Sequence, residues 1–342
     1  MIRDMKVHLR AAARIVVDQT GAPVLDPGRT ATKSGDFWAV LSDDRGQGGA
    51  DSPIVLFYDA PGREQEHPLR ILAGYRGRFP QGGACQSCNA LTETPRENGP
   101  WQRVNGRTHV RRGFVKRFGN EGSPIAKETL HRLAVLCVIE KTVRGQDPAV
   151  CLAARRAPSA PIAAALKPRL EARLSRIPGN SRRAEDIRDT LAPWRGLIRV
   201  LEDGTLELDT NPVETQIRPI ALTRKNAHFA GNRTGAGTWA MHVALPATCK
   251  LANVNPVDDR ADPLRAILDG HSNSRIEDFM PRRYAQPSSL AKCGRPPLLL
   301  SSMVSGLCAI RGDPVSYLPS DEFLAVARRD GVHQSGDPEM GE

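Results

Sequence analysis

The sequence predicts a mixed fold, α+β or α/β, in which a helical segment interrupts a sheet. Three short runs rich in β-branched and aromatic residues, at 14–18, 36–41 and 54–58, are bounded by Gly, Pro or Asp, as the strands of a hairpin-rich sheet are. Apolar residues then recur at helical spacing across residues 122–202, and further helical patterns follow. Strands, then a helical block, then more helices is the order expected of such a fold.

The three strand segments are separated by short turns and predict an antiparallel meander. Asp18 stands at the end of the first segment, just before Gly21. The stretch Lys33-Ser-Gly35 and the glycine-rich stretch before Ile54 have turn sequences.

Helix starts are clearest at two positions. Ser123 is a capping residue followed by proline, and Asn211-Pro-Val-Glu places a cap, then a proline at the first helical position and Glu214 at the third. Between them, two apolar stripes predict helices at 162–177, kinked at its internal proline, and at 187–201. The remaining predictions are a turn at 203–204, a short strand at 206–208 and helices at 238–251 and 262–268.

The composition excludes several classes of protein. Of the 342 residues, 40% are hydrophobic and 25% charged, which supports a packed core and excludes a wholly disordered chain. The net charge is +10, and the excess lies in residues 1–284, because the remainder holds more acidic than basic side chains. A basic surface favours a polyanionic partner, nucleic acid before an anionic membrane, over a merely soluble basic protein.

Neither a membrane span nor a signal peptide is expected. The longest apolar stretch, 298–310, is interrupted by serine and glycine and is shorter than the roughly 20 residues a spanning helix needs. The N-terminal segment lacks an apolar centre. Seven scattered cysteines are typical of reduced thiols in a cytoplasm.

Carboxylates supply the first candidate chemistry. Asp18, at a strand end in a basic protein, suits a Mg²⁺ ligand, because Mg²⁺ is held by one or two carboxylates with phosphate oxygens. The alternative is a turn aspartate. Glu214 is equally explained as a residue that stabilises a helix start, and Asp43 and Asp44 as a solvated turn.

Cys85 and Cys88 have the spacing of half a zinc site. A second cysteine pair or a His-x₃₋₅-His pair is missing from the sequence, so we expect neither zinc binding nor redox function.

Two basic sets could contact phosphates, or could be solvated helix faces. The first lies within 103–117 and the second lies on or just after the Glu214 helix. The predicted DNA-binding residues are His109, Arg111, Arg112, Lys116, Arg117, Arg218, Arg224 and Lys225.

Several stretches together resemble the insertion-sequence-66 family of bacterial transposases, in the family's order, over roughly residues 14–284. The stretches are Val17-Asp-Gln-Thr20, Pro23–Gly28, Thr32–Trp38, Ser42-Asp-Asp-Arg45, Glu66-His-Pro68, Leu72-Ala-Gly-Tyr75, Asn89-Ala-Leu91, Asn211-Pro-Val-Glu214, Ile217–Leu222, Arg224-Lys-Asn226, Phe229-Ala-Gly231, Lys250-Leu251, Val254-Asn-Pro256 and Ser274–Pro281.

The resemblance implies a ribonuclease H-like core with an Asp, Asp, Glu triad. In the family the triad holds two divalent cations, Mg²⁺ or Mn²⁺, that activate water or a 3′ hydroxyl for attack on a DNA phosphodiester. The first Asp corresponds to Asp18 and the Glu to Glu214, and the helical block corresponds to an insertion before the Glu helix.

The sequence departs from the family pattern at the second triad Asp and in a pattern around His109. Gly83 occupies its position, and Cys85 and Cys88 stand where tyrosines are usual. The family's Cys-Trp-x-His-x-Arg-Arg pattern keeps only the histidine, His109, and the arginines that end at Arg112.

The resemblance divides the chain into five segments. These are the first part of the core (1–120), a helical insertion (121–205), the remainder of the core with the Glu helix (206–235), a C-terminal element (236–284) and an unrelated or flexible tail (285–342). The usual N-terminal region of the family is expected to be missing.

The function that the resemblance implies is that of a transposase acting on transposon-end DNA, impaired by Gly83. Alternatives are a non-catalytic DNA-binding or regulatory remnant, and a decayed copy that folds poorly. Implied partners are a second copy of the chain or other transposition proteins, and the implied location is the bacterial cytoplasm at the nucleoid.

Overall fold

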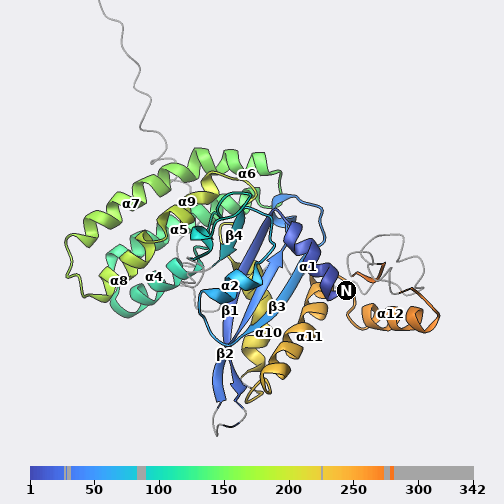
Figure 1. Cartoon of the computed structure of the whole chain (residues 1–342). Helices are drawn as coiled ribbons and strands as arrows, with labels where there is room; N and C mark the ends of the chain where they lie inside the picture. Colours follow the sequence, from blue (N-terminus) through green and yellow to red (C-terminus); the bar gives the residue numbers. More distant parts are fainter. Residues whose placement is uncertain (27, 29–31, 83–89, 225, 273–277, 281–342) are drawn as a thin grey trace, which may run out of the picture.

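A computed structural model describes residues 1–26, 28, 32–82, 90–224, 226–272 and 278–280, and it confirms a mixed fold of helices around one five-stranded sheet (Figure 1). The strands are β1 (Arg14–Leu25), β2 (Thr32–Ser42), β3 (Ile54–Ala60), β4 (Phe79–Gly82) and β5 (Val104–Asn105).

The sheet has the order β3-β2-β1-β4-β5. The antiparallel meander of β1, β2 and β3 is confirmed, whereas β4 and β5 were missed and run parallel to β1. Val17 of β1 lies opposite Gly82, and Gly82 lies opposite Asn105. The carboxyl ends of β4 and β5 therefore lie beside the part of β1 that carries Asp18.

β1 is longer than predicted, so Asp18 lies inside the strand and not at its end. Its ladder with β2 continues to Leu25, and the predicted turn at 33–35 is part of β2. Pro23 is tolerated because β4 pairs with β1 only as far as Val17, which leaves the later residues at an edge. There, Pro23 O accepts a hydrogen bond from the backbone of Ala230.

The helices form two groups and a projecting element (Figure 1). Around the sheet lie α1 (Ile2–Ala11), α2 (Glu66–Ile71), α3 (Ala90–Glu93), α10 (Asn211–Thr223) and α11 (Arg233–Leu251). The helical block begins earlier than the predicted residue 122, because α4 packs with α5 and α8. It consists of α4 (Thr108–Glu121), α5 (Pro124–Val143), α6 (Pro148–Ala154), a π-helical turn (Arg155–Ser159), α7 (Ala160–Leu174), α8 (Arg182–Leu191) and α9 (Trp194–Ile198). α12 (Asp258–Leu268) projects away from the sheet.

Each group has its own core. α10 packs on β1 and β2, and α11 packs on β3. Successive residues such as Val16 and Val17 are both buried, so the sheet is covered on both faces. In the helical block, a second core joins Phe114 of α4 to Leu130 of α5, Leu170 of α7 and other apolar side chains.

The predicted strand at 206–208 is wrong. Leu206 and Leu208 are buried, but the chain turns there. The Gln81 side chain replaces a strand neighbour: its Nε2 donates to the carbonyls of Glu207 at 2.6 Å and Asp209 at 3.1 Å, and its Oε1 accepts from Glu207 N at 3.2 Å. A side chain thus satisfies backbone groups that a strand would have paired.

The predicted helix at 187–201 is divided at Pro193, between α8 and α9, while α7 runs on through Pro168. α11 and α12 each begin several residues earlier than predicted, at Arg233 and Asp258.

The sequence predicts a solvated turn after β2, but this turn is bonded to another part of the protein. Asp43 Oδ2 pairs with Arg45 Nη2 at 2.7 Å, and Arg45 Nη1 donates to the Leu251 carbonyl at 2.8 Å. This turn therefore ties the sheet to the end of α11. Within the described residues, no helix is both long and apolar enough to cross a membrane.

Candidate functional site

Asp18 and Glu214 are carried by elements that pack against each other, β1 and α10. Val213, Ile217 and Ile220 recur at helical spacing and are buried in the same core as the strand residues. This packing holds Glu214, whose side chain is 24% exposed, at the beginning of the helix and near the sheet.

A chain of contacts leads from β1 to Glu214. Val17 lies opposite Gly82, and Gly82 O accepts a hydrogen bond from Gly106 N at 3.0 Å. A methyl group on Gly106 would lie 2.9 Å from Thr210 Oγ1, so the two residues are in close contact. The Thr210 hydroxyl in turn donates to Glu214 Oε1 at 3.0 Å. Glu214 therefore lies at the end of the sheet that is formed by the carboxyl ends of β4 and β5.

The Glu214 carboxylate does not cap its own helix. α10 begins at Asn211 with Thr210 as the N-cap, one residue earlier than predicted, and Thr210 makes no side-chain capping bond. Instead, Asp209 Oδ1 accepts from Asn211 N at 2.9 Å and stabilises the start of the helix. The hydrogen bond from Thr210 holds the Glu214 carboxylate without committing it to the helix backbone.

Asp209 is a site residue that sequence reasoning missed. Burial raises its pKa, and the neighbouring Glu207 and Glu214 carboxylates act in the same direction. The only sequence signal was its position just before Asn211-Pro, which is equally typical of a turn residue.

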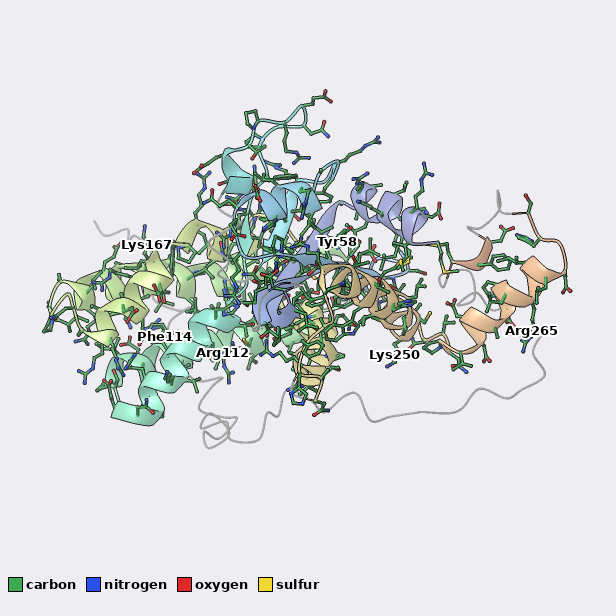
Figure 2. The ribbon with its side chains drawn as sticks, turned by 60° about the horizontal axis from the view of Figure 1, so that its bottom comes forward. Tyr58, Arg112, Phe114, Lys167, Lys250 and Arg265 are labelled. Atoms are coloured by element: carbon green, nitrogen blue, oxygen red, sulfur yellow. The ribbon has the colours of Figure 1, made fainter. Side chains whose placement is uncertain are left out.

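His109 and Arg112 bring α4 to the same place. Arg112 Nη2 lies 3.9 Å from Glu214 Oε2, and Figure 2 shows Arg112 between the helical block and the sheet. Burial lowers the pKa of His109, while the Glu214 carboxylate opposes this shift. Lys116, exposed, follows Arg112 at the i+4 spacing that places both on one helix face. On α10, Arg218 is exposed one turn after Glu214.

The other predicted DNA-binding residues are placed differently. Arg117 is 8% exposed, and its guanidinium bonds Asp186 Oδ2 and Glu121 Oε1, both at 2.7 Å. Its charge is thus used to join α4 to α8. Arg224 Nη1 donates to Thr20 Oγ1 at 3.0 Å, which attaches the end of α10 to β1. Arg111 is half-buried, and Lys225 lies outside the described residues.

Metal ligands are few at this site. In the described part of the chain, no group of three or more His, Cys, Asp or Glu side chains is arranged to hold a metal ion. Gly83, Cys85 and Cys88 lie outside that part. Two metals about 4 Å apart need carboxylates that bridge and flank them. A donor set of Asp18 and Glu214 does not fit such a pair.

The fold and this site define a mixed α/β protein. At the carboxyl ends of its two parallel strands, a carboxylate at the start of one helix faces a second, basic helix. Residues 1–238 match the sequence model of the IS66 transposase family. The chain belongs to this transposase family, as the motifs had predicted.

Curated relatives occur in Sinorhizobium fredii. The chain is 34% identical over 282 residues to the uncharacterized protein y4qI, a match that covers 80% of this chain and 51% of the relative. It is 35% identical over 275 residues to the uncharacterized protein y4jD, covering 80% of this chain and 54% of the relative. The chain thus spans about half the length of the curated relatives it matches.

Proposed function

We propose that this chain acts on DNA as a transposase with a ribonuclease H-like core whose Asp-Asp-Glu site is impaired. The observation that carries the proposal is the packing of the Glu214 helix on the strand that holds Asp18. The sheet order, three antiparallel strands followed by two parallel ones, supports the ribonuclease H-like part.

The side chains at the site suit the binding of a DNA backbone. Arg112 lies beside Glu214, Lys116 follows it on the same face of α4, and Arg218 is exposed one turn after Glu214 on α10. Cations of this kind position phosphates without reading sequence. The hydrogen bond from Thr210 fixes the orientation of the Glu214 carboxylate. Burial lowers the pKa of His109 and so disfavours a like charge beside Arg112.

Impairment follows from the missing carboxylate. In the family, divalent cations supply the activation of the attacking hydroxyl and the neutralisation of the phosphodiester. With Gly83 at the second Asp position, Asp18 and Glu214 would have to hold both cations alone. We therefore expect phosphodiester cleavage to be weak or absent, while binding to DNA persists.

The test is nicking of a supercoiled plasmid with Mg²⁺ or Mn²⁺, for the natural chain and for Gly83→Asp. We expect Gly83→Asp to nick more than the natural chain, and the gain to disappear in the double variant with Glu214→Gln. Gly83→Asn, which has the same size without the charge, is the matched control and should stay inactive. Nicking by the natural chain that Glu214→Gln abolishes would refute the impairment.

A second candidate function is a non-catalytic DNA-binding or regulatory protein. It is favoured by the basic side chains of α4 and α10, which do not depend on the missing carboxylate. This candidate predicts that Gly83→Asp restores no nicking. A chain that only folds poorly, the third possibility, would show no cooperative melt by circular dichroism.

Both functions predict DNA binding that is independent of sequence and sensitive to salt. With about four to six phosphates contacted, the slope of log affinity against log salt is about −4 to −5. Charge reversal at Arg111 and Arg112 should weaken binding to all sequences alike. Tight, salt-insensitive binding to one sequence would contradict this.

The remaining parts of the proposal come from the family. They are transposon-end DNA as the substrate, a second copy or other transposition proteins as partners, and a location in the cytoplasm at the nucleoid.

A further inference from the structure

A cavity of about 600 Å³ lies at the opposite end of β4 from Glu214. Its wall is built by the end of α1, by residues 74–76 just before β4, and by residues 96–101 before β5. The hydroxyl of Tyr75, one of the lining residues, donates to the carbonyl of Ala13, next to the start of β1. The length of β4 therefore separates this cavity from the candidate catalytic site.

Three arginines line the cavity: Arg10, Arg76 and Arg96. Within the described residues, none of the three forms an ion pair with a carboxylate, although Glu97 lies on the wall. Arg96 is held in place by carbonyl oxygens, with Nη2 donating to Tyr75 O at 2.7 Å and Nη1 donating to Gly77 O at 3.2 Å. The cavity thus concentrates positive charge that the protein does not neutralise.

The wall also contains N–H groups without an acceptor. Trp101 is only 6% exposed, and its buried indole Nε1 has no hydrogen-bond partner in the described structure. Arg10 Nε, also buried, has none either. Unsatisfied buried donors are rare in folded proteins. Both atoms lie beneath the surface of the wall, so the charge available to an anion in the cavity comes from the guanidinium groups that line it.

Two buried aromatic rings position Arg96 in the wall. Tyr75 and Trp101 stack with ring centroids 6.5 Å apart, and the Arg96 guanidinium lies 4.3 Å from the centroid of the Trp101 ring. Guanidinium groups match the oxygens of a phosphate, and a cavity of this volume accommodates a group the size of a nucleotide.

We propose that this cavity binds the phosphate of a nucleotide. Arg10 and Arg76 supply the charge, and Arg96 holds the wall together. The site is a second point of contact with a nucleic-acid strand, separate from the residues around Glu214. It goes beyond the proposed catalytic function, because binding here needs neither the metal nor the triad.

The experiment measures binding of the full chain to a fluorescein-labelled single-stranded oligonucleotide by anisotropy, without divalent cation, over a series of salt concentrations. The test variant is Arg10→Gln with Arg76→Gln. The matched control is Arg173→Gln with Arg176→Gln, which removes the same charge from exposed positions on and after α7.

We expect the cavity variant to weaken binding at least tenfold more than the control and to make the salt slope shallower by about 1.4, the value for two phosphate contacts on a single strand. Circular dichroism melts of all variants establish that each is folded.

Competition by thymidine monophosphate distinguishes the two sources of the phosphate. If the mononucleotide displaces the strand from the natural chain and not from the cavity variant, the site takes free nucleotides as well. If only an oligonucleotide competes, the site requires a strand. Equal affinity of the folded cavity variant and its control would overturn the proposal, and nicking by Gly83→Asp would be unaffected by that result.

Discussion

Replacing Arg155 by methionine removes the charge that holds the helical block to the segment before the Glu214 helix. Arg155, in the π-helical turn, is 1% exposed. Its Nε donates to Glu140 Oε2 of α5 at 2.8 Å, its Nη2 also bonds Glu140, and its Nη1 donates to the carbonyls of Asp203 and Gly204, both at 3.3 Å. One side chain thus joins α5, the π-helical turn and the turn at 203–204.

The expected loss follows from the charge left behind. Without Arg155, the Glu140 carboxylate is buried without its partner, and removing one member of a buried pair costs about 3–5 kcal/mol. This is a large fraction of the roughly 5–15 kcal/mol that stabilises a domain. Replacing both residues, Glu140→Leu with Arg155→Met, should recover most of the loss, because no uncompensated charge stays inside.

The assay is urea unfolding followed by circular dichroism for the natural chain, both single variants and the double variant. This double-mutant cycle gives the interaction free energy between the two side chains directly. Replacement of the exposed Arg156, which forms no ion pair in the described structure, is the control and should change the unfolding free energy by less than about 0.5 kcal/mol. The reasoning would be refuted if Arg155→Met lowered the free energy of unfolding by less than about 1 kcal/mol. It would also be refuted if the double variant were less stable than both single variants.

Three further predictions test other parts of the structure. Gly106→Ala should cost about 1–3 kcal/mol by displacing Thr210 from the start of α10, whereas Gly119→Ala, with open space around it, should not destabilise; equal melting temperatures of the two variants would contradict this. Burial raises the pKa of Tyr58 to about 12, so its contribution to stability is complete below pH 10 and is lost as the pH rises from 10 to 12, by up to about 2.7 kcal/mol. In Tyr58→Phe, the free energy of unfolding should fall less between pH 10 and pH 12 than it does in the natural chain. Identical dependence of the unfolding free energy on pH in the two proteins would contradict this. Purified protein should contain no stoichiometric zinc, and a zinc content that falls on Cys85→Ser would show the expectation for Cys85 and Cys88 to be wrong.

Local patterns were sufficient for much of the fold. The strand at 54–58 and the helix start at Ser123 were predicted because alternation, capping residues and prolines act within a few residues of one another. The Glu214 helix was placed to within one residue for the same reason. The strand that carries Asp18 was found but ended too early, because its continuation past Gly21 depends on pairing with β2.

The candidate site was predicted in part. Glu214 was selected from the family's triad and the α4 residues His109 and Arg112 from the basic run at 103–117, and the structure brings these three together. Asp209 and Thr210 were missed because their roles depend on the contact between the start of α10 and Gly106. Arg117 was selected for its charge, but sequence does not show that Asp186, far along the chain, neutralises it.

The sequence by itself determined the mixed fold class, the meander, the helical block, the basic character and the family of this protein, since each is written in composition, local periodicity or ordered motifs. Tertiary structure alone decided the parallel strands β4 and β5, which are four and two residues long and exist because β1 pairs with β4. It also decided the burial of Arg155 and the cavity around Trp101, each of which joins segments that are distant in sequence. Hydrogen bonds and ion pairs between distant segments leave no local periodic signal, so they become visible only when the chain is folded.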